Sequence, residues 1–321
     1  MIPVANAIQI VLAQIRTSSV ELVALDEALG RVLSEDVIAD TDLPPFDRAQ
    51  MDGYAVRAAD LAKTPAQLRI VGESAAGSGW HHEMKAGEAV RIMTGAPVPA
   101  GADAVQQVEL TRESDDAQFV EILEPVDAGR SIVRRASEIK IGETVLRAGE
   151  DINAAMIATL ASFGYGQVKV GRRPRVAIMA TGSELVDVNQ KPGKDQIRDS
   201  NNYTLAAYAK LAGATVERLP LAGDDTEGLK KQIAEAAAHS DVLVTSGGVS
   251  MGVYDFTKAA LKELGAEIFF ERVSLRPGKP TVFARLGKTL VFGLPGNPVS
   301  VAVTFNLFAR TALRAMQGAK Q

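Results

Sequence analysis

Residues 175–184 read RVAIMATGSE, an apolar run that ends at a threonine, a glycine and an acidic residue. A short run of this kind is typical of a strand that is buried on both faces. The same arrangement returns at 241–246 and 289–294, where DVLVTS and TLVFGL also lead into loops with glycine. Stretches with helical periodicity separate these strands, at 202–213, 226–239 and 254–265. The alternation predicts a mostly parallel sheet with helices on both faces, a three-layer α/β/α domain over residues 167–317.

The part of the chain before this sheet has a different character. Residues 1–40 contain an amphipathic helix, a short strand and extended pieces, whereas 41–134 is a series of short β-like runs broken by Gly, Pro and Asp. Asp151 is a plausible N-cap for a helix that Gly164 ends. We therefore expect a multidomain α/β protein with an elongated N-terminal region. Its helical and extended domain combines residues 1–40 with 135–166, and its inserted β-rich domain covers 41–134.

Composition excludes several classes of function. The 35 basic and 39 acidic residues give a net charge of -4, which argues against a broad nucleic-acid surface. The absence of cysteine excludes disulfides, thiolate zinc sites, iron–sulfur clusters and cysteine nucleophiles. The three histidines, His81, His82 and His239, argue against a histidine zinc site or a Ser-His-Asp triad. The opening helix lacks the pattern of a signal peptide and no stretch is long enough to span a bilayer, so we expect a cytoplasmic protein without membrane contact.

Polar loops follow nearly every strand of the predicted sheet. Ligands of such sheets bind beyond the carboxyl ends of the strands. Glycines there let backbone N–H groups approach an anion, and Arg276 and Lys279 add positive charge. Carboxylates in the same loops supply the hard oxygen ligands that Mg²⁺ prefers. These acids are Glu184, Asp199, Asp224, Asp225 and Asp255. The spacing predicts a site for a phosphorylated ligand with a divalent cation.

Each of these features also has a simpler structural interpretation. Two glycines after a strand, as at 247–248, form an ordinary turn more often than a phosphate loop. Asp224 and Asp225 alone could be a helix cap and its solvated neighbour, and RPGKP at 276–280 alone could be an exposed turn. Caps and turns need not gather acids and bases after successive strands, so their joint placement favours the anion site.

Two marked stretches in the first half stay open on spacing alone. Residues 42–61 combine Pro44-Pro45 with Asp52, and can be a rigid turn that enters a strand. Residues 91–105 can be a hairpin connection in which Thr94 is incidental.

Seven motifs in order give the sequence a specific resemblance. They are LDEALGRVLSEDVIADTDLPPFDRAQMDGYAVRAADL (25–61), RIMTGAPVPAGADAV (91–105), ATGSELV (180–186), QIRDSN (196–201), TSGGVSMGVYDF (245–256), RPGKP (276–280) and GLPGNPVS (293–300). In this order, and over residues 1–317, the chain resembles the molybdopterin molybdotransferases, the MoeA and gephyrin E-domain family. The resemblance implies that the protein cleaves the pyrophosphate bond of adenylated molybdopterin with Mg²⁺, releases AMP and inserts molybdate into the dithiolene.

The resemblance also implies site residues and partners. The implied catalytic residues are Asp52, Thr94, Glu184, Asp199, Asp224 and Asp255, of which Glu184, Asp224 and Asp255 would bind the metal. The implied cofactor-binding residues are Gly247, Gly248, Ser250, Arg276, Lys279, Pro295, Asn297, Ser300 and Glu138. The family forms homodimers in which Asp52 and Thr94 would serve the site of the other subunit. Molybdopterin adenylyltransferase and recipient molybdoenzymes would be further partners.

Two departures from the family pattern keep an alternative open. The family reads G-x-N-I-R-x-x-G-E-D-x-x-x-G where this chain has GRSIVRRASEIKIG at 129–142. The exchanged residues are Ser131 for Asn, Val133 for Arg, Ala136 for Gly, Ser137 for Glu and Glu138 for Asp, and Arg134 or Arg135 could stand in for the missing base. The usual C-terminal β domain is also expected to be absent. A non-catalytic molybdopterin-binding protein or a gephyrin-like scaffold is therefore the second interpretation.

Overall fold

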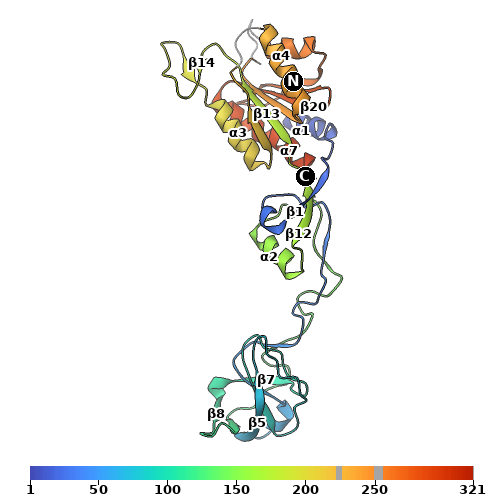
Figure 1. Ribbon diagram of the computed structural model, residues 1–321, viewed down its shortest axis with the longest axis vertical. Helices are drawn as coiled ribbons and strands as arrows, with labels where there is room; N and C mark the ends of the chain where they lie inside the picture. The colour runs from blue at the N-terminus through green and yellow to red at the C-terminus, as the bar shows by residue number, and fades with distance from the viewer. Residues whose placement is uncertain (222–225, 249–255, 321) are drawn as a thin grey trace. The chain divides into compact units, whose positions relative to one another are not determined.

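The computed structural model describes residues 1–221, 226–248 and 256–320. The chain divides into two compact units (Figure 1). One unit combines Met1–Asp36 with Leu146–Gln321, and the other is Val37–Val145.

A six-stranded sheet forms the centre of the first unit. Its order is β16 (Thr215–Arg218), β13 (Arg175–Ala180), β17 (Val242–Ser246), β20 (Thr289–Leu294), β19 (Pro280–Leu286) and β18 (Glu267–Arg272). The first four strands run parallel, whereas β19 and β18 are antiparallel to their neighbours. The predicted mostly parallel sheet is confirmed.

Helices cover both faces of this sheet (Figure 1). One face is covered by α1 (Val4–Ala13), α3 (Asn201–Leu211), α6 (Pro298–Thr304), the π-helical segment Phe305–Ala309 and α7 (Arg310–Met316). The other face is covered by α4 (Thr226–His239) and α5 (Phe256–Glu263). Along β13, Val176 and Ile178 belong to the first core, whereas Ala177 and Met179 belong to the second. Side chains of a strand alternate between faces, so an apolar run without polar alternation is what a sheet buried on both sides requires.

The first helix, α1, packs on the sheet. Ala7 and Val11 lie four residues apart, share one face of the helix and are fully buried in the core that contains Phe308. The division made from the sequence placed this helix with the rest of residues 1–40, outside the sheet domain. Its apolar face contacts the sheet core instead, because an amphipathic helix buries that face against whichever apolar surface the fold brings to it.

A small substructure of the same unit pairs β1 (Val20–Ala24) with β12 (Gln167–Gly171) in antiparallel fashion. The helix beside it, α2 (Ala154–Ser162), is followed by Gly164, which has a φ of 76° as predicted for the residue after a helix. The predicted N-cap Asp151 is wrong, because the side chain of Asn153 accepts the hydrogen bond from the backbone N–H of Met156. Asp151 instead pairs with Arg314 of α7.

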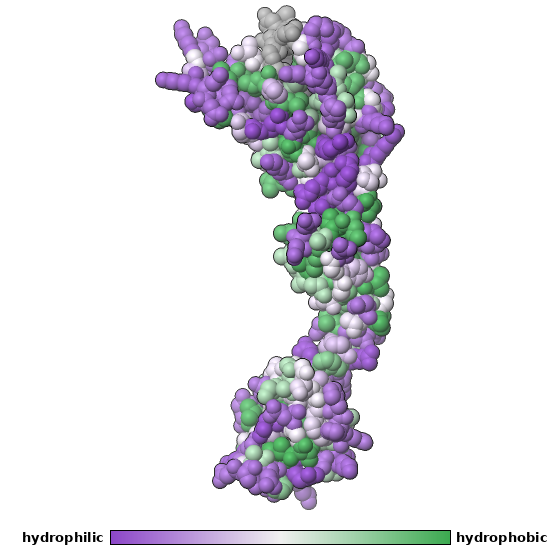
Figure 2. Space-filling view, viewed as in Figure 1, coloured by the Kyte–Doolittle hydropathy of each residue, from purple (hydrophilic) through white to green (hydrophobic). Residues whose placement is uncertain are grey.

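Two short parallel strands, β14 (Leu185–Val186) and β15 (Ile197–Arg198), follow β13 and precede α3. The chain between them consists mostly of exposed residues, and Figure 2 shows mostly hydrophilic side chains there, at the upper left of the view. Because β15 runs directly into α3, this segment sets where the first turn of that helix begins.

The second unit contains a mixed six-stranded sheet, as the predicted β-rich region requires. Its order is β7 (Ala104–Gln107), β4 (Gly53–Val56), β6 (Glu88–Ile92), β5 (Ala66–Ser74), β9 (Phe119–Ile122) and β8 (Thr111–Glu113). Two further pairs are β3 (Arg48–Ala49) with β10 (Ile132–Val133), and β2 (Val37–Ile38) with β11 (Thr144–Leu146). Short 3-10 helices are η2 (Ala58–Leu61) and η3 (Val108–Leu110), and η1 (Leu25–Glu27) lies in the first unit. Two small cores hold the sheet, and Trp80 packs against the one that contains Ile92.

Candidate functional site

Three loops converge at the carboxyl ends of β13, β17 and β20. The backbone N–H of Thr181 donates to the carbonyl of Ser246 at 2.9 Å, and the N–H of Gly247 donates to the carbonyl of Leu294 at 3.1 Å. A Cβ added at Gly296 would lie 3.7 Å from the Cα of Gly247. The loops after these strands therefore contact one another, as the pattern of polar residues predicted.

The glycine pair after β17 is required by its surroundings. Gly247 has a φ of 87°, and a Cβ there would lie 2.3 Å from the carbonyl oxygen of Thr181. Gly248 has a φ of 64°, and a Cβ there would lie 2.5 Å from the hydroxyl of Thr257. Only glycine combines this backbone conformation with so close an approach, so the two predicted binding residues also hold the loop in place.

Buried hydroxyl groups lie beside the glycine pair, and the sequence interpretation gave them no role. The hydroxyl oxygens of Thr245, Ser246 and Thr257 are buried and have no hydrogen-bond partner among residues 1–221, 226–248 and 256–320. The hydroxyl of the neighbouring Thr181, by contrast, has a partner, because it donates to the carbonyl of Ser246 at 3.4 Å. A serine directly before Gly-Gly was the available signal, but its burial depends on neighbouring strands. Unpartnered buried hydroxyls are costly, which favours a ligand for this loop cluster.

The start of α3 adds amide and carboxylate groups to the cluster. The side-chain amide of Asn201 donates to the carbonyl of Gly296 at 2.8 Å, and its Oδ1 has no partner in the described part of the chain. Asp199, predicted to be catalytic, is only 5% exposed, and its Oδ1 accepts the backbone N–H of Asn202 at 3.0 Å. Asp199 thus accepts a backbone N–H of the first turn of the helix, whereas the predicted metal ligand Glu184 is exposed. The motif QIRDSN is the signal that the sequence offers for Asn201.

The RPGKP turn is packed against α6. Gly278 has a φ of 117°, and a Cβ there would lie 2.6 Å from the methyl group of Thr304. This close approach places the turn that contains the exposed residues Arg276 and Lys279 against the helix that carries Ser300, which is 7% exposed. The structure therefore places the predicted oxyanion-binding residues on adjoining elements.

The PGN segment after β20 serves first as a helix start. The side chain of Asn297 accepts the backbone N–H of Val299 at 3.0 Å and that of Ser300 at 3.4 Å, which makes it the N-cap of α6. Pro295 is buried and Pro298 occupies the first turn of the helix. The predicted binding residue Asn297 thus also has a structural role as a helix cap.

Asp52 and Thr94 are in direct contact within the second unit. Asp52 Oδ1 accepts the N–H of Thr94 at 2.6 Å and its hydroxyl at 2.8 Å. These hydrogen bonds, the backbone one first, hold the pKa of Asp52 below its ordinary value. A Cβ at the neighbouring Gly53 would lie 1.9 Å from the carbonyl oxygen of Gln106, so the glycine lets this turn approach β7.

The changed segment 129–142 is tied to the residues before β4 by ion pairs. Glu138 lies 3.5 Å from Arg48, with about half of its side chain exposed. Two further pairs join Arg134 to Asp47 and Arg135 to Asp42, each at 2.6 Å. Arg134 and Arg135, considered as substitutes for the arginine of the family, therefore both have carboxylate partners.

Four predicted site residues lie outside the described residues: Asp224, Asp225, Ser250 and Asp255. Within 1–221, 226–248 and 256–320, no group of three or more His, Cys, Asp or Glu side chains could hold a metal ion. No helix in the part of the chain that the structure covers is long and apolar enough to cross a membrane.

Known families and proteins match the chain over nearly its whole length. The model described as MoeA N-terminal region (domain I and II) matches residues 2–164, and that described as a probable molybdopterin binding domain matches 177–315. A molybdopterin molybdenumtransferase of Staphylococcus aureus (strain COL) is 38% identical over 322 residues, which are 99% of this chain and 76% of that protein. One of Bacillus subtilis (strain 168) is 38% identical over 321 residues, 98% of this chain and 74% of that protein.

A solved structure agrees with the fold. The molybdopterin biosynthesis MoeA protein from Pyrococcus horikosii aligns with a TM-score of 0.83 at 33% identity, covering 100% of this chain and 81% of that one. The predicted family and fold class are thereby confirmed. The chain belongs to the MoeA family of molybdopterin molybdenumtransferases.

Proposed function

We propose that this protein inserts molybdenum into molybdopterin, using adenylated molybdopterin and molybdate as substrates and releasing AMP. Family membership makes it an enzyme of molybdenum cofactor biosynthesis. The observation that carries the proposed site is the convergence of the Thr181, Gly247-Gly248 and Gly296 loops at the carboxyl ends of three parallel strands. In this position backbone N–H groups and buried hydroxyls can bind the phosphates of the substrate.

Arg276 and Lys279 are proposed to bind the molybdate dianion. Both are exposed, and Gly278 between them holds the turn against α6. Charge-assisted hydrogen bonds from guanidinium and ammonium groups to an oxyanion are stronger than neutral ones. Ser300 on the adjoining helix would add a hydroxyl donor. This set would hold the metal-donating anion beside the phosphates.

Magnesium is proposed as the divalent cation, which would neutralise charge on the pyrophosphate during its cleavage. The exposed carboxylate of Glu184 is a hard oxygen donor of the kind that fits Mg²⁺. Asp224 and Asp255 remain proposed ligands by resemblance. Asp199 is proposed to position the start of α3, because its Oδ1 accepts the backbone N–H of Asn202 there.

The proposal includes a cytoplasmic homodimer in which Asp52 and Thr94 of one subunit serve the site of its partner. Molybdopterin adenylyltransferase would supply the substrate, and molybdoenzymes would receive the product. Co-expression of two differently tagged, inactive variants tests the shared site. Mixed dimers of Asp52→Ala with Lys279→Ala should regain part of the activity, since one of their two sites would be intact. Absence of activity in purified mixed dimers would contradict the shared site.

The activity is tested by incubation with adenylated molybdopterin, Mg²⁺ and molybdate, with AMP and metal-loaded cofactor measured separately. We expect both products. Arg276→Ala should reduce molybdenum insertion more than AMP release, whereas Lys288→Ala, an exposed lysine in the turn between β19 and β20, should change neither. Substrate binding without AMP release would reject the enzymatic proposal in favour of a non-catalytic binding protein.

A further inference from the structure

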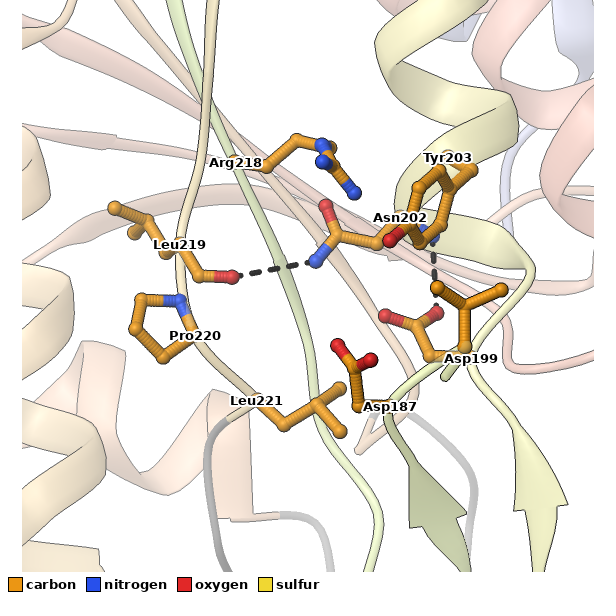
Figure 3. A pocket seen from close by; sticks show the side chains of 9 residues that line it. Asp187, Asp199, Asn202, Tyr203, Arg218, Leu219, Pro220 and Leu221 are labelled. Atoms are coloured by element: carbon orange, nitrogen blue, oxygen red, sulfur yellow. Dashed lines mark hydrogen bonds between the residues drawn. The ribbon is translucent and has the colours of Figure 1, made fainter. Parts of the chain in front are cut away.

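A polar cavity of about 270 Å³ lies at the carboxyl end of β16, beside the first turn of α3 (Figure 3). Its walls come from the β14 and β15 segments, from α3 and from the chain that follows β16. The residues that matter for its chemistry are Asp187, Asp199, Asn202, Tyr203, Arg218 and Pro220. Strand β16 neighbours β13 in the sheet, so the cavity adjoins the loop cluster on that side.

Asn202 lines this cavity and has an unused, buried acceptor. The residue is 4% exposed, its backbone N–H donates to Asp199 at 3.0 Å and its side-chain amide donates to the carbonyl of Leu219 at 3.3 Å. These two bonds fix the amide group, and its Oδ1 has no partner within the described ranges. A buried acceptor that is held in place but left without a donor is rare in folded proteins, and a ligand with an N–H group would satisfy it.

Arg218 and Tyr203 form a flat wall at one end of the cavity. The guanidinium carbon of Arg218 lies 3.9 Å from the centre of the Tyr203 ring, and both side chains are exposed. A guanidinium stacked on a ring presents a planar, cationic surface with several N–H donors. In Figure 3 Asn202 lies between this wall and Asp187, so donors and acceptors face the same small space.

We propose that this cavity binds a flat nitrogen heterocycle that carries an amino group. The amino group would donate to Asn202 Oδ1 and to the Asp199 carboxylate, and the ring would lie against Arg218 and Tyr203. The volume is below the about 300–1,000 Å³ that holds a drug-sized ligand, so it suits one ring system and not a whole dinucleotide-like molecule. A ligand with phosphates would then extend from this cavity towards the neighbouring loops of β13 and β17.

The inference deepens the proposed function and rests on it for the identity of the ligand. Adenylated molybdopterin has two amino-bearing heterocycles, adenine and the pterin, on either side of its pyrophosphate. Either ring has the required chemistry. The cavity is thus a specificity pocket for one end of the substrate, and which end it binds is decided by the two arms of one experiment.

The experiment measures binding of AMP and of 6-hydroxymethylpterin to the full chain by calorimetry. Arg218→Ala and Tyr203→Leu change exposed side chains, so folding should be retained. We expect each to weaken binding of one of the two probes about tenfold or more, as loss of a stacking partner predicts. Arg112→Ala, which removes an exposed arginine of the other unit, is the matched control and should bind both probes as the unchanged chain does.

The outcomes show which heterocycle the cavity binds, or that it binds neither. Selective loss of AMP binding assigns the cavity to adenine, and selective loss of pterin binding assigns it to the pterin. Binding of neither probe, or equal binding to the unchanged chain and the Arg218 variant, overturns the inference. Inorganic diphosphate is measured in parallel: if it binds while the heterocycles do not, the proposed function stands and only the pocket assignment fails. If the probes respond to Arg218→Ala but no AMP is released from the substrate, the pocket stands and the function fails.

Discussion

Asp52 Oδ1 accepts two hydrogen bonds from Thr94, one from its backbone N–H at 2.6 Å and one from its hydroxyl at 2.8 Å. The residues are 42 positions apart, and each alone had an ordinary structural interpretation. Their contact joins the turn before β4 to the loop after β6, so the two motifs form one feature of the second unit. Both hydrogen bonds stabilise the charged carboxylate, which remains an acceptor through its second oxygen.

If Asp52 and Thr94 act as one unit, their substitutions are not additive. We expect Asp52→Asn and Thr94→Val each to lower the rate of molybdenum insertion on the order of tenfold or more. The double variant should be no slower than the slower single variant, because both changes act on one contact: Asn removes the charge that strengthens the hydrogen bonds from Thr94, and Val removes the bond from the hydroxyl. If the loss of rate in the double variant equals the product of the losses in the two single variants, the residues have independent roles. Thr111→Val, which removes a hydroxyl bonded to the carbonyl of Val108, controls for loss of a threonine hydroxyl.

Acid should destabilise the second unit through its hydrogen-bonded carboxylates. The backbone N–H of Ile141 and then Arg135 lower the pKa of Asp42, and Thr94 lowers that of Asp52. A carboxyl whose folded pKa lies below its ordinary value of 3.8 stabilises the fold at pH above 3.8, and this contribution is lost as pH falls through the folded pKa. The urea midpoint should therefore fall as pH is lowered to and below 3.8.

Trp80 provides the measurement, since it is the single tryptophan of the chain and packs on a core of this unit. Its fluorescence follows unfolding of the second unit even if the first unfolds separately. Asp42→Asn should lower the midpoint at neutral pH and make it less dependent on pH. An unchanged pH dependence in this variant would contradict a stabilising role for the charged Asp42.

Local features of the fold were predictable from the sequence, whereas contacts between distant segments were not. Strand and helix alternation is local, so the sheet, its helices and the glycine loops were predictable. The packing of α1 on the sheet was not, because an amphipathic face does not specify its partner. Nor did sequence distinguish Asp151 from Asn153 as the cap, since both residue types cap helices. The burial of Thr245, Ser246 and Asn202 depends on strands distant in sequence, which is why these groups were missed.

Two of the exchanged residues in the segment 129–142 occupy left-handed backbone conformations. Ser131 has a φ of 56° and Ala136 a φ of 58°, at the positions where the family pattern has Asn and Gly. Asn and Gly adopt such conformations at lower cost than other residues. Asn and Gly would therefore suit the backbone at positions 131 and 136, apart from any role in binding.

Ser131→Asn and Ala136→Gly should each stabilise the second unit by about 0.5–1 kcal/mol. The measurement is the urea midpoint followed by Trp80 fluorescence. Ala117→Gly, at a φ of 55°, should behave in the same way. Ala62→Gly, at a φ of −61°, should instead lose stability, because glycine there only adds freedom to the unfolded chain. Equal effects of all four changes would contradict the backbone explanation.

Gly247→Ala should lower the stability of the protein far more than the same change at a glycine with a similar φ and free space around its Cβ position. The new Cβ would combine a φ of 87° with a contact of 2.3 Å to the carbonyl oxygen of Thr181, which together should cost about 2–4 kcal/mol. Gly265 has a φ of 77° and open space around its Cβ position, so Gly265→Ala should cost only about 1 kcal/mol. Thermal unfolding followed by circular dichroism compares them, and similar losses would show that the loop accommodates a side chain.

Asn297 allows its capping role to be separated from its proposed binding role. Asp and Ser cap helices about as well as Asn, so Asn297→Asp and Asn297→Ser should leave the free energy of unfolding within about 0.5 kcal/mol. If the anion site adjoins the start of α6, the new charge of the aspartate should weaken binding of inorganic diphosphate about tenfold, whereas the serine should not. Asn153→Asp, at the cap of α2, makes the same exchange away from the site and should leave binding unchanged. Equal diphosphate affinity of the Asn297→Asp variant and the unchanged chain would mean that the anion does not bind near this helix start.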